Sequence, residues 1–428
     1  MARSLSRDGR IELSREKTAR ASFGAAAQRG FKGKLPLPYP RTMGPNALKY
    51  LQEVVESGLT SDIVERFERT FADKLGVKDC IGAPGCTAAL SVLAAAMKLS
   101  PGDEVVFSSI TDYGTVLGFV RENLIPVFAD TAPGSINIDA KTIERSMTDR
   151  TRAVVVVHKT GIVCDMDPII ALARRRNVML IEDVCQATFS TYKGRLAGTM
   201  GDAAAFSFDS EKTVGSDIGG CIVTNNDALA EAVRLMGQSR AGEMRAGFGR
   251  VHLAPGYALR MPMCTAAITL AQLEIADENV ATRDRMIRLL YQKLAEIPGI
   301  RPLAIPAYQD VYSCWMAGFN IDPRRFRISV DDFAAHLAEA GIAGAGTGRY
   351  YLMPASLPFL SSAADEQTYP FSQPPASRRH HYSGDSCPNA QAFLETFIRW
   401  ATFNDRYTEE HCELAAEIVR DVADRNRA

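Results

Sequence analysis

Short apolar runs alternate with longer amphipathic stretches along most of the chain. Seven of the runs are typical of strands: "DCIGA", "DEVVFSS", "IPVFAD", "RAVVVVH", "VMLIEDV", "AAAFSF" and "GGCIVTN". Segments with helical spacing, such as "TAALSVLAAAMKL" and "MDPIIALARRRN", stand between them. Runs such as "AVVVV" are apolar without alternation, as expected of strands that crossover helices cover on both faces. The pattern therefore predicts an α/β fold built on a mostly parallel sheet.

The second half of the chain has a different pattern. After the helical "DALAEAVRLMG", the segment "MCTAAITLAQLEIADENVATRDRMIRLLYQKLAEI" keeps helical spacing over roughly nine turns and indicates a bridge to a second domain. We expect an N-terminal arm at residues 1–34, a large domain at 35–284 and a small α+β domain at 285–428 that ends in a helix near 408–425. The tract at 354–390, rich in Pro and Ser, reads as a long loop.

Composition narrows the class of protein. The 428 residues are 46% apolar and 23% charged with a net charge of -1, so the basic surplus of a nucleic-acid-binding protein is missing. No run approaches the roughly 18 apolar residues of a membrane span, and the N-terminus lacks the apolar core of a secretory signal. Nine cysteines without a CxxC pair and six histidines without ligand spacing argue for reduced thiols and against a metal centre. We therefore expect a cytoplasmic protein without metal.

The arm at residues 1–34 carries nine Lys or Arg against three acidic residues. Two interpretations stay open, a loosely ordered arm and an arm that clasps a partner subunit.

Polar residues follow four of the predicted strands, where ligands of parallel sheets bind. The turn in "GAPGCTAAL", residues 82–90, opens a helix whose N-terminal amides could hold an anion, although such turns are common. Asp183 ends a buried strand and either caps the next segment or keeps a ligand cation charged. Ser207 either fills its strand or binds a phosphate. Lys212 is either a solvated surface lysine or a Schiff-base lysine.

Several motifs give these residues a common context. The stretch from "VVVVHKTG" to "GGCIVTN" combines VH..G, DMD, IED..QA, YKGR..G, GD...FSF, a lysine five residues after the serine, and GG..VT. In this order the motifs closely resemble the DegT/DnrJ/EryC1/StrS family of pyridoxal-phosphate-dependent sugar aminotransferases. The resemblance covers roughly residues 40–290 and is looser beyond.

The resemblance implies an aspartate-aminotransferase-like fold (fold type I) with a seven-stranded sheet, a homodimer with active sites at the subunit boundary, and pyridoxal 5'-phosphate as cofactor. Lys212 would be the internal-aldimine lysine and the acid and base of the reaction, and Asp183 the partner of the pyridine nitrogen. The remaining contacts would come from Gln186 to the phenolic oxygen, and from Ser207, Thr87 and the amide of Cys86 to the phosphate. The implied activity moves an amino group from glutamate or glutamine to a keto-sugar, free or nucleotide-linked, or to a keto-cyclitol.

The chain also departs from the family pattern. Where the family has an aromatic residue stacked on the cofactor ring, this chain reads "TDYGT", so either Asp112 takes the place or Tyr113 is displaced into it. Ala258 replaces an asparagine that reaches the neighbouring subunit's phosphate, and "SDIGG" replaces GEGG after the lysine.

Two alternative functions, and the residues that line the substrate pocket, stay undecided. A sugar dehydratase of the same fold would carry histidine in place of Lys212, and a regulatory relative would have lost catalysis. Tyr350, Tyr351 and the "SRRHHY" stretch either line the substrate pocket or form a surface loop.

Overall fold

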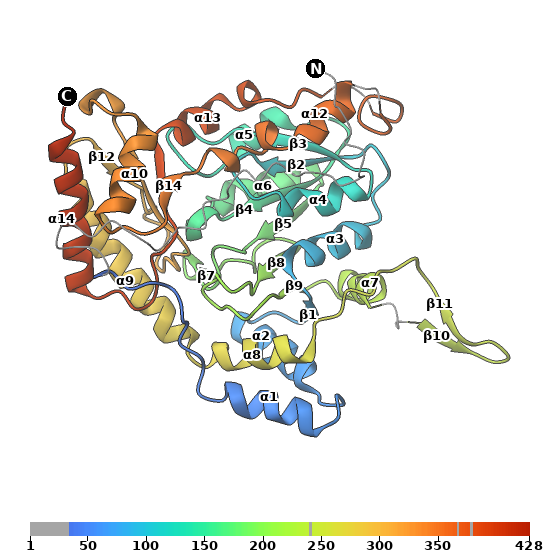
Figure 1. Ribbon diagram of the computed structural model, residues 1–428. Helices are drawn as coiled ribbons and strands as arrows, with labels where there is room; N and C mark the ends of the chain where they lie inside the picture. Colours follow the sequence, from blue (N-terminus) through green and yellow to red (C-terminus); the bar gives the residue numbers. More distant parts are fainter. Residues whose placement is uncertain (1–33, 239–241, 366–367, 377–379) are drawn as a thin grey trace, which may run out of the picture.

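A large sheet forms the centre of the molecule (Figure 1). The computed structural model describes residues 34–238, 242–365, 368–376 and 380–428, so the expected arm lies outside the described residues except for Lys34. The seven predicted strands are all present: β1 (Asp79–Ala83), β2 (Glu104–Ser108), β3 (Ile125–Ala129), β4 (Thr151–Val157), β5 (Met179–Asp183), β8 (Ala203–Ser207) and β9 (Gly220–Thr224).

The sheet has the order β1-β9-β8-β5-β4-β2-β3. β9 runs antiparallel to β1 and β8, and the remaining neighbours are parallel. Every residue of β2, β8 and β9 is buried, as the uninterrupted apolar runs predict. The mostly parallel α/β fold is thus confirmed, and the carboxyl ends of β2, β4, β5 and β8 lie along one edge.

Alternate side chains of the strands enter two apolar cores on opposite faces. Val106 and Val154 belong to one core, and Val105 and Val155 belong to the other. The first core is covered by α1 (Ala47–Glu56), α2 (Ile63–Leu75), α5 (Ala140–Ser146), α6 (Met166–Arg176) and α8 (Met263–Leu273). The second is covered by α3 (Cys86–Ala96), α4 (Gly114–Arg121) and α7 (Asp227–Gly237).

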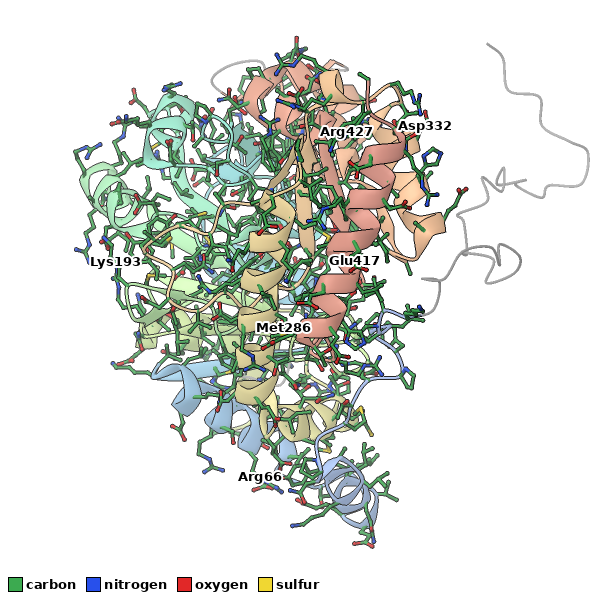
Figure 2. All side chains as sticks on the ribbon, turned by 90° about the vertical axis from the view of Figure 1, so that its left-hand side faces the viewer. Arg66, Lys193, Met286, Asp332, Glu417 and Arg427 are labelled. Carbon is green, nitrogen blue, oxygen red and sulfur yellow. The ribbon has the colours of Figure 1, made fainter. Side chains whose placement is uncertain are left out.

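The segment expected as one helical run of about nine turns forms two helices. α8 ends at Leu273, and α9 (Ala276–Ala295) begins after Ile275, whose φ of -111° and ψ of 3° leave helical geometry. Apolar spacing continues across this change of direction, so the pattern alone does not reveal it. Figure 2 shows α9 beside the terminal helix α14 (Glu409–Arg425), with Met286 of α9 buried.

A third apolar core joins α9 to an antiparallel sheet of order β12-β13-β15-β14. Its elements are β12 (Ile300–Pro302), β13 (Ala317–Ile321), α10 (Val330–Ala340), β14 (Ala345–Thr347) and β15 (Phe397–Trp400). The helical pattern of "SVDDFAAHLAEAGI" and the terminal helix are both confirmed.

The tract at 354–390 is not a plain loop. It completes α11 (Met353–Ser356), contains α12 (Pro358–Asp365), and leads into α13 (Pro388–Glu395). Leu357, Leu360, Phe371 and Tyr382 are buried in the core that α3 and α4 cover. The many Pro and Ser residues conceal these apolar anchors, which hold the tract against the large sheet.

Two hairpins complete the described structure. β6 (Thr191–Tyr192) pairs with β7 (Arg195–Leu196), and β10 (Gly242–Arg245) pairs with β11 (Gly249–His252). The second hairpin extends away from the body of the molecule (Figure 1). None of the helices in the described part of the chain has the length and apolar character that crossing a membrane requires.

Candidate active site

Asp183 lies at the centre of the polar strand ends. It is the last residue of β5 and only 2% exposed. Its Oδ2 accepts a hydrogen bond of 2.7 Å from Thr115 Oγ1 on α4, and its Oδ1 accepts one of 3.0 Å from the Cys185 amide. A buried carboxylate with two neutral donors keeps capacity for a cationic partner. The sequence pattern gives no sign of Thr115, because its hydroxyl reaches Asp183 only through the fold.

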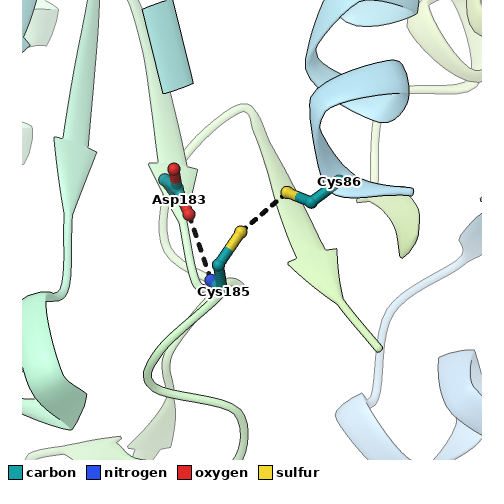
Figure 3. Close-up of side chains that lie close together, drawn as sticks. All are labelled: Cys86, Asp183 and Cys185. Carbon is teal, nitrogen blue, oxygen red and sulfur yellow. Dashed lines mark hydrogen bonds between the residues drawn. The ribbon is translucent and has the colours of Figure 1, made fainter. Parts of the chain in front are cut away.

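Two thiols lie beside this carboxylate (Figure 3). Cys185 donates to Cys86, with 2.7 Å between the two Sγ atoms, and Cys86 is the first residue of α3. The hydrogen bond with Cys86 and burial raise the pKa of Cys185; the same bond acts to lower the pKa of Cys86, but burial outweighs it. Potential metal-ligating atoms of Cys86, Asp183 and Cys185 lie within 4.8 Å of one another. The spacing of the cysteines along the chain does not indicate this cluster.

The N-terminus of α3 is open toward the site. Its N-cap residue, Gly85, has no side chain to cap the first amides, which leaves them available to an anion. On β9, a Cβ at Gly220 would lie 2.5 Å from Cys86 N, so glycine permits this close approach. Ser207, which ends β8, pairs with Gly220 in the sheet. The fold therefore brings Ser207 to the same turn as Cys86.

Thr87 is also beside this turn. It is exposed, and its Oγ1 would lie 2.5 Å from a Cβ at Gly114, the first residue of α4. The hydroxyl of Thr87 is thus held between the two helix N-termini. Together these placements support the predicted anion site, whose occupant stays a prediction.

Lys212 lies on the loop after β8. Arg41 donates to the carbonyls of Ser210, Lys212 and Thr213 at 2.9, 2.7 and 3.1 Å. Lys212 Nζ lies 4.0 Å from the ring centroid of Trp315, whose Nε1 donates to the Glu211 carbonyl. Arg41 and Trp315 come from distant parts of the chain, and the sequence analysis did not identify either. They fix the backbone of the lysine loop and give its amine an aromatic face.

Gln186 connects this region to the turn after β4. Its Oε1 accepts a 2.8 Å hydrogen bond from Thr160 N, and the Thr160 carbonyl accepts one of 3.0 Å from Trp315 N. Thr160 lies in a one-turn 3₁₀ helix, η1 (Lys159–Gly161), and has a φ of +60°. A positive φ in a β-branched residue persists only where the surroundings determine it. The turn is therefore held firmly in place.

Lys159 begins this turn and is fully buried. Its Nζ lies 3.2 Å from the ring centroid of Tyr351, in η3 (Arg349–Tyr351), and has no hydrogen-bond partner among the described residues. Burial lowers the pKa of Lys159 to about 7. The carboxylates of Asp112 and Asp183 oppose the shift, and the charges of Lys212 and Arg399 add to it.

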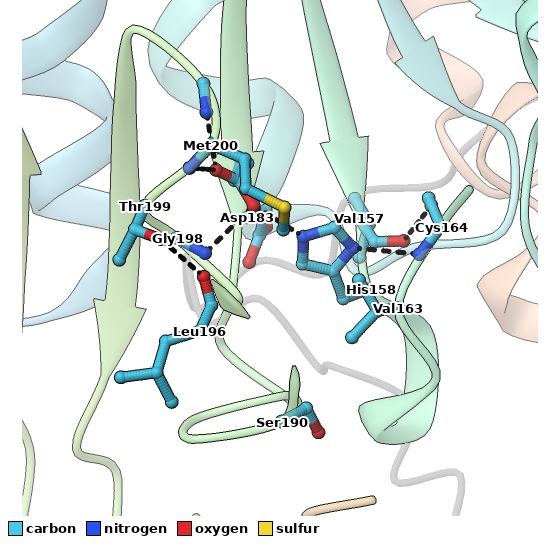
Figure 4. A network of polar contacts seen from close by, with 12 residues as sticks. Val157, His158, Val163, Cys164, Asp183, Ser190, Leu196, Gly198, Thr199 and Met200 are labelled. Atoms are coloured by element: carbon cyan, nitrogen blue, oxygen red, sulfur yellow. Dashed lines mark hydrogen bonds and ion pairs between the residues drawn. The ribbon is translucent and has the colours of Figure 1, made fainter. Parts of the chain in front are cut away.

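His158 and Glu182 form a buried network behind the site (Figure 4). The carboxylate accepts hydrogen bonds from His158 Nε2 at 3.0 Å and from the amides of Gly198, Met200 and Gly201 at 2.7 to 2.8 Å. Burial acts to raise the pKa of Glu182, but these hydrogen bonds outweigh it and the pKa lies below its ordinary 4.5. The network connects the end of β4, the end of β5 and the segment before β8.

Other sequence expectations have varied outcomes. The side chain of Tyr113 is 56% exposed, Asp112 is exposed and accepts from the Gly114 amide, and the choice between them for ring stacking stays open. Ala258 is exposed. The structure places Tyr351 beside Lys159, and Arg399 Cζ lies 5.7 Å from the Tyr350 ring centroid.

The "SRRHHY" stretch does not reach the site in the part that the structure describes. His380 Nε2 lies 3.4 Å from Glu104 Oε1 at the beginning of β2, and Tyr382 Oη donates to the Pro126 carbonyl near the beginning of β3. These are the amino ends of two parallel strands, on the opposite edge from Asp183. The pocket interpretation is therefore wrong for His380.

Comparisons with known proteins identify the family of the chain. The sequence model of the DegT/DnrJ/EryC1/StrS aminotransferase family matches residues 41–401. The chain is 38% identical over 268 residues to a GDP-perosamine synthase of Caulobacter vibrioides, covering 62% of this chain and 71% of that protein. It is 37% identical over 280 residues to a Micromonospora echinospora protein described as an L-glutamine:3-amino-2,3-dideoxy-scyllo-inosose aminotransferase, covering 63% of this chain and 66% of that protein. The solved structure of the aminotransferase TlmJ from Streptoalloteichus hindustanus matches with a TM-score of 0.73 at 26% identity, covering 89% of this chain and 96% of that one.

Proposed function

Because the chain belongs to the DegT/DnrJ/EryC1/StrS aminotransferase family, we propose that it is a pyridoxal-phosphate-dependent transaminase of keto-sugars or keto-cyclitols. The acceptor is a keto-sugar, free or nucleotide-linked, or a keto-cyclitol, and the donor is glutamate or glutamine. The names of the two relatives support this substrate class, since one acts in GDP-perosamine synthesis and the other on an inosose. The single observation that carries the proposal is the convergence of Asp183, Lys212 and the open N-terminus of α3 at one edge of the sheet.

The residues at this edge fit pyridoxal phosphate. The uncapped amides of α3, with Thr87 and Ser207, suit a phosphate, and buried Asp183 suits a protonated pyridine nitrogen. Gln186 Oε1 accepts from Thr160 N, so the NH₂ group of Gln186 would be the donor for the phenolic oxygen. When bound, the cofactor supplies a ring that accepts electron density from the carbon that gains or loses the amino group.

The side chains around the site have distinct tasks in this reaction. Asp183 would keep the ring nitrogen of the bound cofactor protonated. Thr115 orients the Asp183 carboxylate. Lys212 Nζ takes the proton from the reacting carbon of the donor and returns a proton to the acceptor carbon. Arg41 holds the lysine loop by three carbonyls. Trp315 provides a surface on which the amine rests between these transfers.

A homodimer is also part of the proposal. The hairpin β10–β11 exposes Met244 at 77% and Phe248 at 84%, and α1 exposes Leu48 and Val55. Large apolar side chains this exposed are typical of surfaces that a partner covers. The family resemblance supports a second copy of this chain as that partner. The nine cysteines, all free, support a cytoplasmic location.

Borohydride reduction tests the proposed function. The purified protein should carry cofactor that borohydride fixes covalently to Lys212, and L-glutamate should convert the cofactor to its pyridoxamine form. Lys212→Ala should lose the covalent fixation, whereas the control Lys193→Ala, an exposed lysine of the β6–β7 hairpin, should keep it. Fixation that persists in Lys212→Ala would overturn the role of the lysine. Conversion by no amino acid would overturn the transaminase and favour the regulatory alternative.

A further inference from the structure

Lys159 has a position that the proposed chemistry does not use. It is 1% exposed, and its Nζ makes no hydrogen bond with any described residue. Burying a charged amine without a partner is energetically costly, so buried amines are rare unless a partner binds them. Contact with the Tyr351 ring offsets only part of this cost. The missing partner points to a ligand.

The amine lies in the middle of the candidate active site. The charged groups that act on it are Asp112 before α4, Asp183 on β5, Lys212 after β8 and Arg399 on β15, with Tyr350 and Tyr351 of η3 on the remaining side. Each of the charged groups comes from a different element at the carboxyl edge of the sheet or from the facing small sheet. Lys159 is therefore close enough to Lys212 and Asp183 for their charges to act on its amine.

The backbone of Lys159 is fixed by hydrogen bonds, whereas no hydrogen bond to a described residue fixes its amine. Thr160 is bonded to Gln186 and to Trp315, and the Lys159 amide donates to Asn137 Oδ1 at 3.3 Å. The four-carbon stem can turn the amine from the Tyr351 face toward an entering group without any backbone movement. An amine on a fixed turn with a mobile stem suits the capture of an anion.

We propose that Lys159 binds a carboxylate of the amino donor. This inference rests on the proposed function, which requires an amino acid whose carboxylate is attached to the reacting carbon. This carboxylate is one bond from the reacting carbon, whereas the distal part of a sugar or a nucleotide is many bonds away, so the carboxylate is the donor group best placed to meet a cation inside the site. Arg399, beside Tyr350, supplies a second cation for a dicarboxylic donor. Lys159 thus holds the carboxylate that all amino-acid donors share, and Arg399 favours a donor with a second carboxylate.

The proposal predicts a specific pH dependence. Burial lowers the pKa of Lys159 to about 7, so the amine of the empty site is mostly neutral at pH 8.5. Pairing with a carboxylate requires the protonated form and therefore takes up a proton above pH 7. The affinity for a carboxylate should fall about tenfold for each pH unit above 7 and stay level below it.

Calorimetry with glutarate tests this on the holoenzyme at pH 6.5 and 8.5. Glutarate has both carboxylates but no amino group, so it binds whether or not the protein transfers amino groups. The wild type should bind it more than tenfold more weakly at pH 8.5 and take up close to one proton there, read from two buffers of different ionisation enthalpy. Lys159→Met should bind it about 10- to 100-fold more weakly at pH 6.5, with no proton uptake.

Two further variants separate binding from folding. Lys159→Arg keeps a permanent charge and should bind glutarate tightly at both pH values. Lys193→Met, an exposed control, should behave as the wild type. Equal affinity of wild type and Lys159→Met, or a pH dependence that persists in Lys159→Met, would overturn the proposal. The proposal would also be overturned if Lys159→Met bound glutarate normally but lost affinity for a sugar acid such as glucuronate. In that case Lys159 would bind a carboxylate of the acceptor. A holoenzyme that binds glutarate through Lys159 but reacts with no amino acid would refute the proposed function alone.

Discussion

Glu182→Gln should be among the most destabilising conservative substitutions in this protein. Both carboxylate oxygens are fully used: Oε1 accepts from the amides of Met200 and Gly201, and Oε2 accepts from Gly198 N and His158 Nε2. The Cys164 amide donates to His158 Nδ1, so the ring hydrogen of the neutral imidazole is on Nε2. All four groups that face Glu182 are therefore donors.

The magnitude follows from this geometry. A glutamine has one acceptor oxygen and one NH₂ group, so either amide orientation turns a donor against two buried donors. If the NH₂ replaces Oε1, the amides of Met200 and Gly201 lose their acceptor; if it replaces Oε2, Gly198 and His158 do. Each unsatisfied buried donor costs about 1–3 kcal/mol, which gives about 2–6 kcal/mol for the substitution.

Urea unfolding of the cofactor-free protein measures the effect. The free energy of unfolding should drop by about 2–6 kcal/mol at pH 7, whereas the exposed control Glu144→Gln should change it by less than about 0.5 kcal/mol. A loss below about 1 kcal/mol for Glu182→Gln would refute the argument, because it would mean that the network relaxes without leaving unsatisfied donors.

The difference should also depend on pH. The pKa of Glu182 is lower in the folded protein than its ordinary 4.5, so the folded state binds fewer protons than the unfolded state. The stabilisation is therefore complete above about pH 5.5 and is lost as the pH falls through 4.5 toward the folded pKa. The difference in the free energy of unfolding between wild type and Glu182→Gln should therefore become smaller in that pH range.

Two further predictions concern the site and the assembly. Thr115→Val keeps the shape of the side chain but removes the donor to Asp183 Oδ2. Cofactor dissociation, followed by absorbance, should therefore become about tenfold faster. An unchanged rate would contradict the orienting role of Thr115. The double variant Met244→Ser, Phe248→Ser should raise the dissociation constant of the proposed dimer about tenfold or more in sedimentation measurements. The control Lys141→Ser on α5 should leave this constant unchanged. A monomeric wild type would exclude the dimer.

The sheet could be predicted from the sequence because each strand has its own local signal. All seven strands coincide with apolar runs, and "AVVVV" indicates burial on both faces by composition alone. The position of Asp183, Ser207 and Lys212 followed from the same reasoning, since residues after parallel strands share an edge. The chemical roles of these residues came from the motifs, not from the pattern.

The contacts that complete the site could not be predicted in this way. Arg41 precedes α1 and Trp315 precedes β13, yet both contact the Lys212 loop, and no local pattern records a contact between segments so far apart. The break between α8 and α9 and the apolar anchors of the 354–390 tract were missed for a related reason. Both features depend on packing against other parts of the fold, which a local sequence pattern does not record.

The two lysines of the site show why position, and not residue type, decides their roles. Lys212 is partly exposed on a loop that Arg41 holds, with its amine on the open face of Trp315, so a carbonyl carbon can approach it. Lys159 has the lowered pKa of a nucleophilic amine, but its Nζ is buried against the Tyr351 ring, whereas Lys212 is partly exposed. A low pKa alone would favour Lys159 as the Schiff-base lysine. Because covalent chemistry requires access as well as a free electron pair, we propose bond formation for Lys212 and ionic binding for Lys159.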